Sequence, residues 1–238
     1  MSYHFQEGEV LLIDKPLDWT SFDVVNHIRS FLKKVYGIKK LKVGHAGTLD
    51  PKASGLLIIC TGKMTKQIDT YQGMEKVYIG QMTLGATTPS CDTETEPDNH
   101  YNIENIQLSD LKEATNKFLG DIEQVPPEYS AIKINGKRAY NLIRKKEEVK
   151  LKPRKITIQQ FDILTYDPPV ANFYVKCSKG TYIRSLVRDL GKSIGNGAYL
   201  SALKRTQIGK YKLSDALSLE AFKDRVLNET GYQQLTNN

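Results

Sequence analysis

The chain has 238 residues, of which 39% are hydrophobic and 26% are charged, so it has the composition and length of an ordinary globular protein with a full core. Its three cysteines lie far apart and are odd in number, which argues against a disulfide framework or a paired-cysteine zinc site, and we expect reduced thiols. No apolar run approaches the roughly 20 residues that span a bilayer, and the first seven residues lack the features of a signal peptide, so a cytoplasmic location is expected.

The charge is positive and unevenly distributed. Thirty-four Lys and Arg against 27 Asp and Glu give a net charge of +7, which favours a polyanionic partner. Residues 133–155 hold ten Lys or Arg and two acids, whereas residues 91–110 hold six acids and no Lys or Arg. Because a phosphate backbone would be attracted by the first segment and repelled by the second, we expect a binding side and a back.

The chain begins with a predicted strand and helix. Residues 8–16 read as a short strand that Pro16 stops. Thr20 or Ser21 can cap the helix that follows, and Gly37 ends it. The apolar residues of this helix recur on one face at helical spacing: Val24, Val25, Ile28, Phe31, Leu32 and Val35.

Residues 44–55 are rich in glycine and lead into the apolar run of residues 56–60. A loop of this kind brings backbone close to another group, or adopts dihedral angles that side chains with a Cβ resist. Its single carboxylate, Asp50, is the candidate for chemistry. An aspartate before a proline is also often a plain turn, whose carboxylate accepts hydrogen bonds from nearby backbone N–H groups. The local pattern leaves both interpretations open.

The middle of the chain alternates between strand and helix patterns. Residues 76–85 predict a strand with a mostly apolar second face; Tyr78 lies on this face and can belong to the core or to a site. The acidic residues 92–98 are expected to form a solvated loop. Ser109 is expected to cap a helix that Gly120 closes.

The Ile-Asn-Gly-Lys turn at residues 134–137 predicts a hairpin or strand end, and a helix with an exposed basic face is predicted at residues 138–146. Strands follow at residues 155–166 and 172–178.

Residues 177–191 predict a strand, a glycine turn and a helix in succession. Arg184 lies in the first helical turn, where a positive charge is unfavourable unless it pairs with an anion, which could be Asp50 or a substrate phosphate. A last helix is capped near Ser218. Strands outnumber helices, so the predicted fold class is α+β, with a mixed, largely antiparallel central sheet flanked by helices and loops.

Several of these stretches resemble the TruB family, the bacterial tRNA pseudouridine-55 synthases. The resemblance covers roughly residues 8 to 211. The matching sequences are Asp14-Lys15-Pro16, Gly44-His45-Ala46-Gly47-Thr48-Leu49-Asp50-Pro51, Lys76-Val77-Tyr78, the segment 125–140 and Lys179-Gly180-Thr181-Tyr182-Ile183-Arg184. It implies the pseudouridine synthase fold, with a catalytic domain over residues 1–213. Residues 214–238 would be a short helix and tail without the PUA domain that many members carry.

The resemblance also implies the roles of particular residues. Asp50 would be the catalytic aspartate, and Arg184 would hold it charged and aimed. Tyr78 and Tyr182 would form the walls of a uracil pocket, and His45 would fill the gap that a flipped base leaves in the RNA.

Leu203 would line the active site. The basic residues 133–155, with Lys204 and Arg205, would contact phosphates, while the shape of the tRNA T-arm would give recognition. The implied reaction is an isomerisation that needs no cofactor, and we expect a monomer that binds no metal and no membrane.

Two alternatives stay open at this point. The chain could be a pseudouridine synthase that acts on another RNA, in which case only the substrate would change. It could also be a non-catalytic RNA-binding protein or RNA chaperone that uses the same basic face, although such a protein has no use for a carboxylate that faces RNA.

Overall fold

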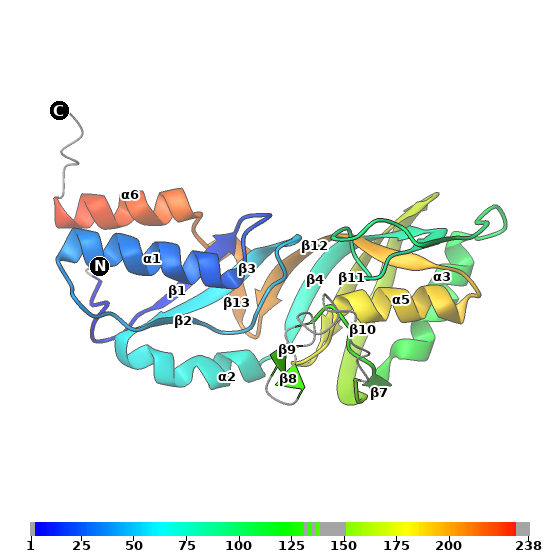
Figure 1. Cartoon of the computed structure of the whole chain (residues 1–238), viewed down its shortest axis with the longest axis horizontal. Coiled ribbons are helices and arrows are strands. Elements are labelled where there is room, and N and C mark those ends of the chain that lie inside the picture. The colour runs from blue at the N-terminus through cyan, green and yellow to red at the C-terminus, as the bar shows by residue number, and fades with distance from the viewer. Residues whose placement is uncertain (1–2, 131–132, 135–136, 139–150, 232–238) are drawn as a thin grey trace. The chain divides into compact units, whose positions relative to one another are not determined.

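The computed structural model describes residues 3–130, 133–134, 137–138 and 151–231 (Figure 1). The chain divides into two compact units, each described here by itself. The first unit consists of Met1–Lys76 and Lys204–Asn238, and the second unit of Val77–Leu203. Strands and helices of both units occur in one α+β chain, as the sequence predicts.

The sheet of the first unit is built around β3 (Ala53–Thr61). On one edge, β3 pairs antiparallel with β1 (Val10–Lys15). Near its end it also pairs antiparallel with β2 (Val43–His45). The next strand in the sheet order is β12 (Ala198–Ile208), which in turn pairs with the short β13 (Tyr211–Lys212).

Of the two long helices of the first unit, α1 begins and ends where the sequence predicts, and α6 begins where it predicts. In α1 (Ser21–Tyr36), the Thr20 side chain accepts a hydrogen bond from the Asp23 backbone, and Gly37 closes the helix with a φ of 64°. Ser218 caps α6 (Leu219–Thr230), which lies beside α1 (Figure 1). The shorter helical elements of the first unit are η1 (Gly62–Gln67), α2 (Ile68–Gly73) and η3 (Leu213–Asp215).

Both faces of β3 are buried, because side chains of one strand point alternately to opposite faces. Leu57 and Ile59 belong to a cluster with the apolar faces of α1 and α6. Leu56 and Ile58 belong to a second cluster on the other face, with Tyr71 of α2. The apolar run of residues 56–60 is thus the central strand of this unit.

The first six residues of β12, 198–203, belong to the second unit, where the strand order is β12, β4, β11, β10, β7. Antiparallel pairing joins β10 to β11 and to β7. The sequence predicted β4, β10 and β11 to within a few residues. Their bounds, with that of β7, are β4 (Lys76–Leu84), β7 (Gly120–Gln124), β10 (Arg154–Asp167) and β11 (Val170–Cys177).

The helices of the second unit are α3 (Leu108–Thr115), which packs on β10, and α5 (Ile183–Ser193). Gln107 caps α3, not Ser109: its side chain accepts a hydrogen bond from the Asp110 backbone, while the Asp110 carboxylate accepts one from the Gln107 backbone. The helix passes into a 3-10 turn, η2 (Asn116–Phe118), before Gly120.

Two small antiparallel ribbons complete the described part of the chain. The predicted hairpin is confirmed by the pairing of β8 (Lys133–Ile134) with β9 (Lys137–Arg138). The other ribbon joins β5 (Ala86–Thr87) and β6 (Asn99–His100). The helix expected at residues 138–146 lies outside the described residues.

All three cysteines are free thiols, as predicted, and all three are buried. Among the residues that the structure describes, no helix is both long and apolar enough to cross a membrane.

Candidate active site

Asp50 lies in a short loop of the first unit, between the end of β2 and the start of β3, and is half-buried. Backbone hydrogen bonds fix both halves of this loop: Ala46 N donates to Ile58 O at 2.9 Å, and Ala53 N donates to Asp50 O at 3.0 Å. Gly47 has a φ of +97°, which side chains with a Cβ rarely adopt.

The first residue of α1 anchors the residue before Asp50. The Ser21 hydroxyl accepts a hydrogen bond from Leu49 N at 2.9 Å and donates one to Leu49 O at 3.1 Å. Both residues are buried. Because the two bonds satisfy both backbone polar groups of Leu49, the chain direction at Asp50 is set by the start of a helix.

Arg205 holds the loop that carries Asp50 through hydrogen bonds to its backbone. Its side chain is buried, with Nε donating to Leu56 O at 2.8 Å and Nη2 to Gly47 O at 3.1 Å. A Cβ at Gly55 would lie 2.4 Å from the backbone oxygen of Arg205, so only glycine allows this close approach. The expected contact between Arg205 and phosphate is therefore wrong, because its guanidinium is enclosed and satisfies backbone carbonyls. Lys204, its neighbour, is half-buried.

Sequence reasoning missed a role for Lys15, which is fully buried at the end of β1. Its ammonium donates to Pro16 O at 2.8 Å and to Trp19 O at 2.6 Å. Burial lowers the pKa of Lys15 to about 8; the charge of Asp50 opposes that shift and the charge of Arg205 adds to it. Asp50 and Arg205 are thus the two charged side chains that act most on the ammonium of Lys15.

A signal for Lys15 was present in the sequence. Leu11, Ile13 and Lys15 alternate along β1, and all three are buried. A lysine at the inward position of an alternating strand must find acceptors, since an unpaired buried charge is costly.

The other side of the loop is tied to the turn after β1. Asp18 N donates to Pro51 O at 2.9 Å, and the Asp18 carboxylate pairs with Lys52 at 2.8 Å. Asp18 has a φ of 63°, which is uncommon for a residue other than glycine. The turn and the loop that carries Asp50 thus hold each other in place.

His45 ends β2, just before this loop, and is half-buried. Burial lowers the pKa of His45, and the positive charge of Arg205 lowers it further, against the opposing effect of a backbone hydrogen bond at Gly47. The imidazole is therefore held neutral near pH 7.

The other predicted site residues belong to the second unit. Tyr78 on β4 and Leu203 on β12 are buried, Tyr182 immediately precedes α5 and is half-buried, and Arg184 is buried in the first turn of that helix. The structure thus assigns His45 and Asp50 to one unit and these four residues to the other. That all six line one cleft stays a prediction.

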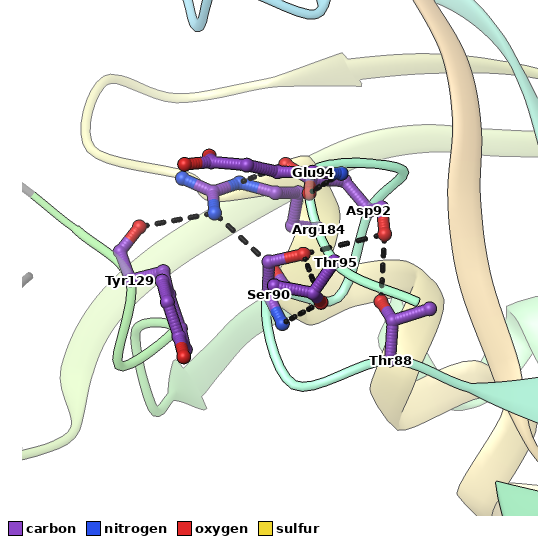
Figure 2. A network of polar contacts seen from close by, with 7 residues as sticks. All are labelled: Thr88, Ser90, Asp92, Glu94, Thr95, Tyr129 and Arg184. Carbon is purple, nitrogen blue, oxygen red and sulfur yellow. Dashed lines mark hydrogen bonds and ion pairs between the residues drawn. The ribbon is translucent and has the colours of Figure 1, made fainter. Parts of the chain in front are cut away.

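Arg184 has anionic and neutral acceptors inside the second unit (Figure 2). Its Nε lies 3.5 Å from Asp92 Oδ2, and both side chains are 5% exposed. Its Nη1 donates to Ser90 O at 3.1 Å and to Tyr129 O at 3.0 Å. The sequence indicates the need for an anion beside this arginine, and Asp92 is one that it did not identify.

The loop around Asp92 corrects another expectation. The solvated loop was predicted over residues 92–98: its acids from residue 94 onward are exposed, but Asp92 itself is buried. Its carboxylate accepts a hydrogen bond from Glu94 N at 2.9 Å, and its carbonyl accepts one from Thr88 Oγ1 at 2.7 Å (Figure 2). Asp92 is thus fixed on both sides before it meets Arg184.

Within the described ranges, no group of three or more His, Cys, Asp and Glu side chains could hold a metal ion.

Comparison with protein families gives two matches that together span most of the chain. Residues 33–183 match the TruB family pseudouridylate synthase (N terminal domain), and residues 184–237 match the tRNA pseudouridylate synthase B C-terminal domain.

Relatives of similar length agree with these matches. A protein of Phocaeicola vulgatus named tRNA pseudouridine synthase B is 52% identical over 221 residues, which cover 93% of this chain and 94% of the relative. One of the same name from Parabacteroides distasonis is 50% identical over 220 residues, which cover 92% of this chain and 94% of the relative.

Among solved structures, a chain of the crystal structure of a Cbf5-Nop10-Gar1 complex superposes with a TM-score of 0.71 at 28% identity. The match covers 97% of this chain and 58% of that chain. These matches confirm the resemblance and the pseudouridine synthase fold that it implied. By its sequence over nearly its whole length, this chain belongs to the TruB family of pseudouridylate synthases.

Proposed function

We propose that this chain converts a uridine of tRNA, at position 55 in the T-loop, into pseudouridine. The bond between uracil N1 and ribose C1′ breaks, the base turns, and a bond forms between C5 and C1′. N1 gains a proton and C5 loses one, so the reaction is an isomerisation that needs no oxidant, reductant or energy source. Family membership and the shared name of the two relatives support this assignment.

The observation that carries the proposal is the fixed backbone of the loop that carries Asp50. Ser21 fixes the preceding residue, Arg205 holds the carbonyl of Gly47, and the buried ammonium of Lys15 attracts the carboxylate. A carboxylate of this kind can attack ribose C1′ as a nucleophile, or remove a ribose proton to release a glycal. Both routes use the same carboxylate, and both need it to be aimed rather than free to rotate.

The residues of the second unit have proposed roles around the base. Arg184 would orient and charge-pair with Asp50, while Tyr78 and Tyr182 would give the detached uracil flat surfaces on which to turn. Leu203 would line the same cleft. Flipping the uridine from the T-loop costs a few kcal/mol, and His45 would stack in the space that it leaves.

We propose that a monomer binds the T-arm through its shape. The basic residues 133–155 would supply phosphate contacts, with residues 1–213 as the catalytic domain and residues 214–238 as a short helix and tail. The affinity for tRNA should fall as salt rises, with a log–log slope of about one for each phosphate that the chain neutralises. An affinity for tRNA that does not change with salt would contradict this part of the proposal.

Asp50→Asn tests the chemistry. Tritium release from tRNA labelled at uridine C5 should fall by about a thousandfold or more, because the amide is neither a nucleophile nor a base, while tRNA binding should be kept. Asp69→Asn, in the exposed first turn of α2, is the matched control and should retain activity. Turnover by Asp50→Asn would refute the assigned role.

The same assay separates the alternatives. Preference for an rRNA fragment over tRNA would change the substrate and keep the chemistry. Binding of tRNA without any tritium release by the unmodified chain would favour a non-catalytic RNA-binding role.

A further inference from the structure

We propose that Gln124 is a positioning residue, which fixes the backbone of Tyr182 and so sets the place of that tyrosine beside the base. The inference rests on the proposed function, because the reaction defines what Tyr182 does. Gln124 ends β7 and is 3% exposed. It is 58 positions from Tyr182 in the sequence, so no local pattern connects the two residues.

The nitrogen and the oxygen of the Gln124 side-chain amide both form hydrogen bonds with the backbone of Tyr182. Its Nε2 donates to Tyr182 O at 3.0 Å, and its Oε1 accepts from Tyr182 N at 2.8 Å. A primary amide carries a donor and an acceptor side by side, so it matches the N–H and the C=O of a single extended residue. Tyr182 has the extended dihedrals that this pairing needs, with φ −98° and ψ 109°.

Tyr182 depends on this partner because of its place in the chain. It occupies the cap position of α5, where no side-chain capping bond is made. The carbonyl oxygen of Tyr182 also accepts a hydrogen bond from Leu186 N at 3.1 Å. Together with the bond from Gln124, this uses both lone pairs of that oxygen. The direction in which the chain enters α5 is therefore set by an amide from another strand.

The residue after Gln124 strengthens the attachment. Val125 O accepts from Ser185 Oγ at 2.8 Å and from Arg188 Nη2 at 3.0 Å. These bonds hold the body of the first turns of α5, whereas the Gln124 bonds act on Tyr182 itself. Loss of the Gln124 amide should thus displace the tyrosine more than it disturbs the helix.

Gln124→Glu gives a test with a pH signature. The ionised carboxylate keeps an acceptor for Tyr182 N but places an oxygen against Tyr182 O; protonation converts that oxygen into a donor and restores the pairing. Near pH 8 we expect kcat for pseudouridine formation to fall about tenfold, the kinetic equivalent of one or two hydrogen bonds, with KM for tRNA little changed. Divided by the wild-type rate at each pH, the activity of the variant should rise as pH falls.

Gln207→Glu is the matched control, because the Gln207 amide also donates to a backbone carbonyl, that of Gly209 at 2.7 Å, in the first unit. The activity of Gln207→Glu, divided by that of the wild type at each pH, should not change with pH. A flat ratio for Gln124→Glu, or full activity of that variant near pH 8, would overturn the inference.

Gln124→Leu gives a readout that does not need activity. Hydrogen exchange of the Tyr182 amide should accelerate by about tenfold or more, while that of Leu186 should stay protected if the helix is intact. Unchanged exchange at Tyr182 would refute the inference. Loss of protection at both amides would also refute it, since it would show a structural role only. If the unmodified chain makes no pseudouridine, the proposed function fails, and the exchange experiment alone decides the role of Gln124.

Discussion

The guanidinium of Arg205 donates a hydrogen bond of 3.1 Å to the carbonyl oxygen of Gly47, three residues before Asp50. The same guanidinium donates to Leu56 O at 2.8 Å, beyond the other end of the loop. One planar side chain therefore spans the segment that carries the catalytic candidate, which a guanidinium does well because its donors form a fixed fork.

Arg205→Lys should destabilise the chain and lower activity. A lysine is a point charge that cannot serve both carbonyls in the same geometry, so one buried acceptor is left without a donor. We expect a loss of about 2–4 kcal/mol in the free energy of unfolding, measured by urea denaturation, and a slower rate of pseudouridine formation. Lys204→Ala, at the half-buried neighbour, should change stability by about 0.5 kcal/mol or less. Equal stability of Arg205→Lys and the wild type would contradict the supporting role of the fork.

Local signals in the sequence account for much of the fold. The cap at Thr20, the left-handed Gly37 and the alternation of β4 and β11 act through neighbours in the chain, so pattern reasoning located these elements. Arg205 was misread because its acceptors come from a segment about 150 positions earlier. The hint in the sequence was that Arg205 follows Leu203 by two positions, so in a strand both side chains point to the same face; the structure buries both.

Asp92→Asn should weaken the second unit and the positioning of Arg184. The pair is buried, so removal of one charge leaves the other without compensation, with a loss of about 3–5 kcal/mol in stability. The asparagine oxygen can still accept the Glu94 backbone bond, so the loop should keep its path. Denaturation and tritium release measure the two effects. Asp98→Asn is the control in the same loop, since Asp98 is exposed and accepts a bond from Thr87; equal effects of the two substitutions would count against the ion pair.

Part of the candidate site could also be predicted from local signals in the sequence. Asp50 stands out in its glycine-rich stretch, and Arg184 at a helix start indicates the need for an anion. Asp92 looked like one more acid of a solvated loop, because sequence composition does not show which member of a charged run turns inward. The contact that decides this joins residues 92 positions apart.

His45 should titrate below 6.5 in the folded chain. Burial and the nearby charge of Arg205 both lower its pKa, so the folded state resists protonation more than the unfolded state does. The stability contributed by a neutral His45 is present above about pH 6.5 and is lost as pH falls through the lowered pKa. An NMR titration, assigned by the resonance that disappears in His45→Gln, measures this directly. A midpoint at or above 6.5 would contradict the half-buried, neutral imidazole on which its stacking role depends.

The lowered pKa of Lys15 predicts that the free energy of unfolding rises at alkaline pH. Its pKa is about 8 in the folded chain, against an ordinary value of 10.5, because burial disfavours the charged form. Between these two values the unfolded state binds more protons than the folded state, so the stability of the wild type should rise with pH relative to Lys15→Met, in which the group is absent. Urea midpoints of the two proteins at about pH 7 and about pH 9.5 give this difference, in which the titration of all other groups cancels. Since Asp50 raises the pKa of Lys15, the Asp50→Asn background should move the rise to lower pH. A difference that is constant across this range would show that Lys15 keeps its proton in the folded chain as it does in the unfolded chain, and would contradict the lowered pKa; its two carbonyl acceptors, Pro16 O and Trp19 O, would then be enough to offset burial.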